Sequence, residues 1–302
     1  MLVFVVICIF ISWEYYVETE EMNTFASLAE MVEEQRKIDT GNEGSSSNSS
    51  ENQPVIPRQA EKQTVQQKLV LNKAMQIASA GPISGAEMRS TLSTAQDYLV
   101  SDENGIEEKR ILPQYLALYE QNPDLYGWIR IDGTKVNYPV MFSPQEPERY
   151  LSKDYYGKKA KYGVPFVDGA TDTQSRNLLI HGHNARSGIL FGDLDKYEEK
   201  SFWKEHRYIR FDTLYEERLY EIVAVCQTSA LIRSDGVEQF FGFANIWDDI
   251  SMMYYTQFLS RNVMYDTGLS IGINSELITL STCSYHTKEG RLIIVAKRMK
   301  LI

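Results

Sequence analysis

The spacing of apolar residues changes along the chain and divides it into parts. Residues 1–13, MLVFVVICIFISW, form an uninterrupted apolar run, whereas residues 41–53, GNEGSSSNSSENQ, contain almost nothing that a core could bury. Residues 61–79 and 111–124 carry apolar positions three or four apart, which predicts helices. From Tyr126 apolar positions alternate with polar ones, which predicts strands. The pattern therefore predicts a short helical part followed by a mainly β domain.

The alternating part of the chain predicts many short strands. Residues 128–140, WIRIDGTKVNYPV, indicate two strands around an Asp–Gly turn. Short strands separated by irregular segments are typical of a closed β-barrel or a sandwich, so the predicted fold class is mixed α/β and mainly β. Further strands are predicted at 163–168, 176–181, 207–212, 217–228, 276–283 and 291–298.

A long insert, residues 229–275, separates the strand at 217–228 from the strand at 276–283. A helix is predicted within it, because apolar residues recur there at helical spacing. Such a helix would form the wall or lid of a groove, or would cover an open barrel end, and both roles can hold together. The face predicted to be apolar carries Ile246, Ile250, Met253, Tyr254 and Phe258.

The apolar run at residues 1–13 has two interpretations. As a helix it would span about 20 Å, less than the roughly 30 Å hydrocarbon core of a bilayer, and it has no flanking Lys or Arg. It is either the end of a signal anchor that begins upstream or a buried helix of a soluble domain. The acidic and Ser/Asn/Gly-rich tracts that follow favour the anchor. We therefore expect a membrane anchor at 1–17, a stalk and linker at 18–60, and a folded domain at 61–302 with a helical segment at 61–122.

Composition narrows the range of functions. The formal net charge is −10, and this acidic excess disfavours nucleic acid as a partner, because phosphate binding needs a clustered basic surface. Cys8, Cys226 and Cys283 form no close pair, so neither a disulfide scaffold nor a structural zinc site is indicated. Each is then either an inert buried thiol or a free catalytic one. No acidic loop indicates a calcium site, and no cofactor is expected.

A cysteine, an arginine and a histidine each lie at or next to the end of a predicted strand. Cys283 ends the strand at 276–283, and Arg291 opens the next strand eight residues later, so a hairpin would place the two side by side. His183 follows the apolar strand at 176–181 in a glycine-containing loop. A thiol attacks as its thiolate, an imidazole can take or donate the proton, and a guanidinium can hold a developing oxyanion. Together these side chains predict a nucleophilic thiol site.

The stretch TLSTC that ends at Cys283, followed by a strand that Arg291 opens, is similar to the signature of the sortase family. The resemblance covers residues 112–299 and is strongest to class B of that family. By motif, Cys283 matches the nucleophile, His183 the family histidine and Arg291 the family arginine. The insert before the cysteine strand and the leading helices are also similar to class B members. The other matching motifs are Gly182-His183-Asn184 with Phe191 and Gly192-Asp193-Leu194, Gly127-Trp128-Ile129, and Asn137-Tyr138-Pro139-Val140.

The resemblance implies a fold, an activity and a location. The fold would be a closed sortase-type β-barrel with N-terminal helices and a helix in the connection before the cysteine strand. Cys283 would attack a threonine carbonyl in the C-terminal sorting motif of a secreted protein, Arg291 would stabilise the oxyanion, and His183 would protonate the departing amine. The thioacyl-enzyme would pass the acyl group to an amine of peptidoglycan or of a pilin subunit, without a metal. The enzyme would be a single-pass membrane protein with an extracellular catalytic domain.

The other histidines and Cys226 receive different interpretations. His181 is the alternative active-site histidine, but the family motif has an aromatic residue at its place and a histidine directly after glycine. His286 lies three residues beyond the nucleophile and is interpreted as a rim residue, and His206 as structural. Cys226 shares a strand face with apolar residues, which predicts a core position.

Four residues are predicted to contact the substrate. Ser281 and Thr282 directly precede the cysteine, Leu151 matches a groove-lining apolar position of the family, and Tyr254 lies on the predicted helix of the insert. A turn-forming role for Ser281 and a packing role for Tyr254 stay open as alternatives. Pro147 stands where some class B members have a polar residue, so the sorting-motif specificity of the family does not transfer.

Two other functions compete with transpeptidation. A papain-type protease, which is a hydrolase, has its nucleophile early, at the start of a helix, with its histidine far downstream. Here the histidine precedes the cysteine by 100 residues, and the cysteine ends a strand. A non-catalytic surface adhesion module with an anchor and a linker would need no reactive thiol. The motifs favour the transpeptidase over both.

Overall fold

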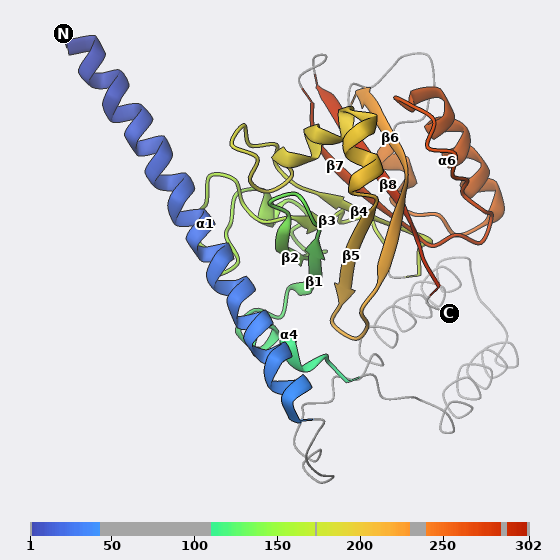
Figure 1. Ribbon diagram of the computed structural model, residues 1–302, viewed down its shortest axis with the longest axis horizontal. Coiled ribbons are helices and arrows are strands. Elements are labelled where there is room, and N and C mark those ends of the chain that lie inside the picture. The colour runs from blue at the N-terminus through green and yellow to red at the C-terminus, as the bar shows by residue number, and fades with distance from the viewer. Residues whose placement is uncertain (1, 43–109, 173, 230–239, 285–288, 301–302) are drawn as a thin grey trace, which may run out of the picture. The chain divides into compact units, whose positions relative to one another are not determined.

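The computed structural model describes residues 2–42, 110–172, 174–229, 240–284 and 289–300 (Figure 1). The chain divides into two compact units, one formed by Met1–Ser46 with Leu112–Ile302 and the other by Ser47–Ile111. All of the described residues except 110 and 111 belong to the first unit. The predicted linker from residue 43 onward and the predicted helix at 61–79 lie outside the described residues.

The strands of the described residues close into a barrel (Figure 1). Their order is β1-β2-β3-β4-β7-β8-β6-β5, and pairing of β5 with β1 completes the closure. The barrel confirms the fold class predicted from the alternating pattern. The strands are β1 Leu125–Arg130, β2 Asn137–Met141, β3 Phe166–Val167, β4 Asn177–His181, β5 Tyr208–Thr213, β6 Leu219–Ser229, β7 Leu277–Cys283 and β8 Gly290–Arg298.

Each predicted strand has a counterpart in the barrel, but the one predicted at 163–168 is much shorter. Only Phe166–Val167 pairs with its neighbours. Gly163 has a positive φ of 63°, which is not a strand conformation, and Pro165 has no N–H to donate to a ladder. The strand therefore begins only after the proline.

The strands that lead to the candidate site are covered on both faces. Every residue of β7 before Cys283 is buried, and β8 is buried from Leu292 to Ala296. Such continuous burial is typical of strands in the centre of a covered sheet. β4 runs parallel to β7, and β8 returns antiparallel to it. Therefore β4 and β7 finish, and β8 starts, at the same end of the barrel.

Short helices and single turns connect the strands. The helix predicted at 111–124 is α4, Pro113–Gln121, with a proline in its first turn, where the missing N–H costs nothing. The remaining elements are η1 Arg149–Leu151, η2 Gly192–Glu198, α5 Lys200–Glu205, η3 Phe240–Phe243 and α6 Asp249–Asn262.

The helix predicted in the insert is α6, and it begins with a capping box formed by Asp248 and Ser251. The residues predicted to share one apolar face are not all buried. Ile246 and Phe258 are buried, but Ile250, Met253 and Tyr254 are 64%, 63% and 54% exposed. Apolar residues occur on more than one face of this helix, so their spacing alone could not select the buried one. The residues that pack against β6 and β7 are Met252, Tyr255, Phe258 and Leu259.

The N-terminal apolar run is part of a long helix, α1 Leu2–Asn42, drawn in blue in Figure 1. Phe25, Leu28 and Val32 in its second half are buried, and this half contacts α4 and β2. The first half exposes most of its large apolar side chains. Within the described residues, no helix is both long and apolar enough to cross a membrane. The segment expected to be a stalk thus contributes side chains to the packed unit.

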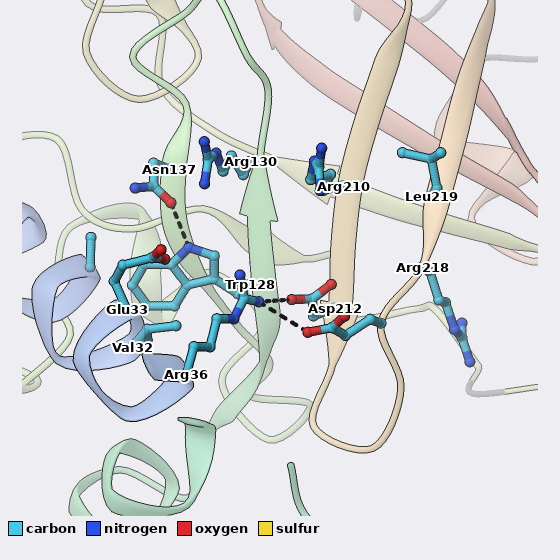
Figure 2. A pocket seen from close by; sticks show the side chains of 12 residues that line it. Val32, Glu33, Arg36, Trp128, Arg130, Asn137, Arg210, Asp212, Arg218 and Leu219 are labelled. Atoms are coloured by element: carbon cyan, nitrogen blue, oxygen red, sulfur yellow. Dashed lines mark hydrogen bonds and ion pairs between the residues drawn. The ribbon is translucent and has the colours of Figure 1, made fainter. Parts of the chain in front are cut away.

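A polar network joins α1 to the barrel beside a cavity of about 220 Å³ (Figure 2). Arg36 donates hydrogen bonds to the Asp212 carboxylate of β5 and, at 3.0 Å, to the Tyr115 hydroxyl of α4. Tyr115 donates to the same carboxylate at 2.5 Å. Burial raises the pKa of Asp212, against the opposing effects of the Tyr115 hydrogen bond and the Arg36 charge. Because it joins three elements, this network fixes α1 on the barrel.

Candidate active site

The candidate side chains meet where the ends of three strands come together. The parallel pairing of β4 with β7 ends at His181 and Ser281. His183 follows directly after β4, Cys283 is the last residue of β7, and Arg291 is the second residue of β8. The barrel therefore joins the histidine loop to a cysteine 100 residues further along the chain.

A cavity of about 380 Å³ opens at this end of the barrel. It is lined by Cys283, His183 and Arg291, and three of the predicted substrate contacts, Ser281, Thr282 and Leu151, line it as well. The remaining lining residues are Pro147, Glu148, Phe166, Asp168, Gly169, Ala170, His181 and Gly182.

Cys283 and Arg291 are direct partners in the β7–β8 ladder. The ladder continues into the turn, where the Ser284 N–H donates to the Gly290 carbonyl at 2.9 Å. Opposite residues of an antiparallel pair present their side chains on the same face, so the thiol and the guanidinium share the cavity. The eight-residue spacing in the sequence predicts this arrangement.

The three cysteines lie in different environments. Cys283 is a free thiol of intermediate exposure. Cys226 is fully buried, its Sγ donates weakly to the Leu259 carbonyl at 3.8 Å, and burial raises the pKa of its thiol to about 12. Cys8 is exposed on α1 and lies outside the cavity. Cys226 is a core residue, as predicted, and Cys283 is the thiol that a substrate in the cavity can reach.

Arg291 is oriented from its own turn. Its Nη1 donates to the Gly290 carbonyl at 3.0 Å, and its Nη2 lies 3.9 Å from a carboxylate oxygen of Glu289. The side chain is 21% exposed, so it is held on one side and open on the other. A guanidinium has five N–H donors in a fixed fork, which leaves donors available for a carbonyl oxygen bound beside Cys283.

His183 is positioned by its loop and by η1. Its Nε2 lies 3.0 Å from the Leu151 carbonyl oxygen, which can only accept, so Nε2 carries a proton and Nδ1 is the atom left for proton exchange. The His183 carbonyl accepts from the Phe191 N–H at 3.0 Å. A Cβ at Gly182 would lie 2.5 Å from the Phe191 ring, so this position requires glycine. Gly182, His183 and Phe191 therefore pack together.

A second histidine in the cavity has a carboxylate partner that no sequence motif indicates. His181 Nε2 lies 2.8 Å from Asp168 Oδ2, and both side chains are about four-fifths buried. Burial alone would raise the pKa of Asp168, but hydrogen bonds from His181 and from the Ala170 N–H outweigh it and hold that pKa below its usual value. Asp168 ends the strand predicted at 163–168, and that terminal position was the available signal.

The two residues before Cys283 differ in their contacts. The Thr282 hydroxyl donates to the Gly182 carbonyl at 2.8 Å, which ties β7 to the histidine loop. The Ser281 side chain is buried and lines the cavity, and among the described residues its Oγ has no hydrogen-bond partner. A buried hydroxyl without a partner is unfavourable, so a group bound in the cavity could supply one.

The remaining predicted residues lie elsewhere. Tyr254 lines a separate surface cavity on α6 together with Ile250 and Met253 and is absent from the lining of the Cys283 cavity. The His206 ring packs against the Phe202 ring at the end of α5, with the ring centroids 4.3 Å apart, which fits its structural interpretation. His286 lies outside the described residues.

Comparison with known proteins identifies the relatives of this chain. The family model described as the sortase domain matches residues 129–299, more than half of the chain. Sortase B of Staphylococcus aureus is 28% identical over 204 residues, which cover 64% of this chain and 78% of the relative. Sortase B of Listeria monocytogenes is 29% identical over 184 residues, which cover 60% and 72%. The crystal structure of sortase B from Bacillus anthracis matches with a TM-score of 0.55 at 28% identity and covers 72% of this chain and 98% of its own.

The barrel and the matched relatives together define a cysteine transpeptidase. This chain belongs to the sortase family, and its relatives place it in class B. The resemblance seen in the sequence motifs is thereby confirmed.

Proposed function

We propose that this sortase uses Cys283, His183 and Arg291 to cleave a C-terminal sorting motif of secreted proteins and to join the acyl group to an amine. The proposal rests above all on the pairing of Cys283 with Arg291 inside the cavity that His183 also lines. This arrangement supplies a nucleophile, an oxyanion donor and a proton carrier around one bound peptide.

The reaction would proceed in two acyl transfers. In the first, His183 takes the thiol proton of Cys283, Sγ bonds to the threonine carbonyl carbon, Arg291 stabilises the oxyanion, and the C–N bond breaks as His183 gives the proton to the departing amine. In the second, an acceptor amine attacks the thioester, the C–S bond breaks, and His183 carries the amine's proton to the departing thiolate of Cys283. The acceptor would be an amine of peptidoglycan or of a pilin subunit.

The proposal is tested with the full chain in mild detergent, because residues of α1 pack in the same unit as the barrel. The protein is incubated with a library of threonine-containing sorting peptides and with glycine or lysine amines, and the products are read by mass spectrometry. We expect an acyl adduct on Cys283 and a peptide joined to the amine. Products of hydrolysis alone would favour a protease. The absence of any adduct would defeat the proposal, and it is the result expected of a non-catalytic adhesion module.

We further propose that the first half of α1 attaches the enzyme to the membrane, with the catalytic barrel outside the cell. The support is a run of exposed apolar side chains before the packed half of the same helix, among them Ile7 and Ile11, which are 50% and 60% exposed. Exposed apolar surface of this extent on one helix favours burial in a lipid phase.

Vesicle binding tests the attachment. The full chain is expected to co-sediment with phosphatidylcholine–phosphatidylglycerol vesicles, and the variant with Ile7→Glu and Ile11→Glu is expected to lose at least about tenfold in bound fraction, because two charges would enter the apolar region. Ile250→Glu on α6 is the control, since this side chain is 64% exposed elsewhere in the unit. Equal loss in the control, or no loss in the α1 variant, would rule out attachment through α1.

A further inference from the structure

The side chain of Asn184, the residue directly after His183, makes contact with the backbone of Cys283. Its Nδ2 lies 2.8 Å from the Cys283 carbonyl oxygen, and 2.8 and 2.9 Å from the two carboxylate oxygens of Asp195. We propose that Asn184 is a positioning residue: held by Asp195, it fixes the nucleophile strand against the histidine loop. This inference rests on the proposed role of Cys283 as nucleophile.

Among the described residues, the two hydrogens of the Asn184 amide match the acceptors that lie around its nitrogen. The Nδ2 group carries two hydrogens. One is shared between the two oxygens of the Asp195 carboxylate, and the other is left for the Cys283 carbonyl. The reverse amide orientation would place the side-chain oxygen against three acceptors. Asp195 therefore determines which way the amide faces, and thereby directs its second N–H to Cys283.

The contact between Asn184 and Cys283 lies just beyond the last paired residues of β4 and β7. Register between β4 and β7 ends at His181 and Ser281, and the Gly182 N–H still donates to the Ser281 carbonyl at 3.1 Å. Beyond that point the Thr282 hydroxyl reaches back to Gly182, and the amide of Asn184 reaches forward to Cys283. The Asn184 bond thus extends the connection to the residue that bears the thiol.

Asp195 is held firmly enough to act as an orienter. It lies in η2, which follows Phe191, and the Phe191 N–H bonds to the His183 carbonyl. A Cβ at Gly192 would lie 2.0 Å from the Ala185 carbonyl oxygen, so the loop closes tightly between Asn184 and Asp195. Burial raises the pKa of Asp195, and the hydrogen bond from Asn184 opposes this rise. The Asn184 amide therefore offsets part of the unfavourable effect of burial on the Asp195 carboxylate.

The test compares Asn184→Ala with Asn177→Ala in the full chain. Asn177 is a matched control, because it is a buried asparagine on β4 whose amide donates to the Phe243 carbonyl at 2.7 Å, outside the Cys283 cavity. With a peptide that acylates the wild type, Asn184→Ala is expected to lower kcat for thioacylation about tenfold or more with KM within twofold, because small misplacements of reacting groups slow chemistry rather than binding. Asn177→Ala is expected to lower the melting temperature and to leave kcat unchanged.

A double-mutant cycle tests whether Asp195 acts through Asn184. Asp195→Ala alone is expected to lower kcat less than Asn184→Ala, and the double variant is expected to match Asn184→Ala, since the second change removes nothing further. A double variant whose loss is the product of the two single losses would overturn the inference. So would Asn184→Ala with wild-type kcat, or an equal loss of kcat in Asn177→Ala.

Alkylation by iodoacetamide separates this inference from the proposed function. The rate at Cys283, located by peptide mass spectrometry, is measured from pH 5 to 9 without any sorting peptide. Asn184→Ala is expected to lower this rate about fivefold or more near pH 7, because the thiolate is the reacting form and a displaced Cys283 no longer lies opposite the Arg291 guanidinium. If no peptide of the library forms an adduct, the proposed transpeptidation by Cys283 is defeated. The alkylation rate of Cys283 still tests the positioning role of Asn184 in that case. An unchanged alkylation profile would overturn the positioning.

Discussion

Replacing Cys283 with alanine is expected to abolish both the acyl adduct and the transfer of peptide to amine, by at least about a thousandfold in kcat. Without a nucleophile no thioacyl-enzyme forms, and loss of a nucleophile is among the largest single effects in enzymes of this kind. The fold should survive, because Cys283 ends its strand at intermediate exposure and its hydrogen bonds from the ladder use backbone atoms. Mass spectrometry of the intact protein after incubation with peptide measures the adduct.

Cys8→Ser is the control for this experiment. Cys8 is also a free thiol and is exposed on α1, so its loss removes a reactive group without touching the cavity. Activity within twofold of the wild type is expected. An adduct that persists in the Cys283→Ala variant, or that disappears in the Cys8→Ser variant, would show that the nucleophile was assigned wrongly.

Replacing Arg291 with lysine is expected to lower kcat by about a hundredfold or more while KM changes little. Lysine keeps the positive charge but loses the planar fork of donors, and removal of one oxyanion donor typically costs 10²–10³ in kcat, or about 3–4 kcal/mol. The Gly290 carbonyl contact that orients the guanidinium would also be lost. Single-turnover acylation kinetics at saturating peptide measure the effect on chemistry rather than on binding.

Arg298→Lys supplies the matched control at the other end of β8. Arg298 bonds to Glu276 at 2.7 Å and to Glu216, and neither carboxylate lines the Cys283 cavity. This variant is expected to lose at most a little stability and no acylation rate. Wild-type acylation by Arg291→Lys would contradict the oxyanion role, and equal losses in the two variants would point to a general effect on the strand.

The strands that carry the site could be predicted because their information is local. Alternating and continuous apolar runs located β4, β6, β7 and β8. The eight residues from Cys283 to Arg291 suffice for a hairpin, and the ladder places the two residues opposite each other. A hairpin is a short-range contact, so sequence spacing is enough to set it.

The choice of histidine could not be made from spacing. His181 and His183 both line the cavity, and their hydrogen bonds differ. His181 is engaged by the carboxylate of Asp168, whereas His183 is held by a backbone carbonyl. These partners come from other elements, and no local pattern indicates them. The family motif selected His183, and only the closed barrel showed that His181 lines the same cavity beside a carboxylate.

Two further features were decided by packing between distant segments. The buried face of α6 is set by β6 and β7, which accept Tyr255 and Phe258 and leave Tyr254 outside. The second half of α1 packs with α4 and β2, although its sequence is typical of a charged stalk. In both helices several faces carry apolar residues, and the neighbour selects among them.

By itself the sequence determined the mainly β character of this chain, the order of its strands along the chain, and the pairing of thiol with guanidinium. These follow from residue periodicity and from one short turn, which act over a few residues. Only the tertiary structure decided that the ends of β4, β7 and β8 share one cavity, that Asp168 partners His181, and that Asn184 reaches the Cys283 backbone. The cavity and the Asn184 contact depend on the parallel pairing of β4 with β7, which brings together segments about 100 residues apart, and the Asp168 contact depends on the pairing of β3 with β4.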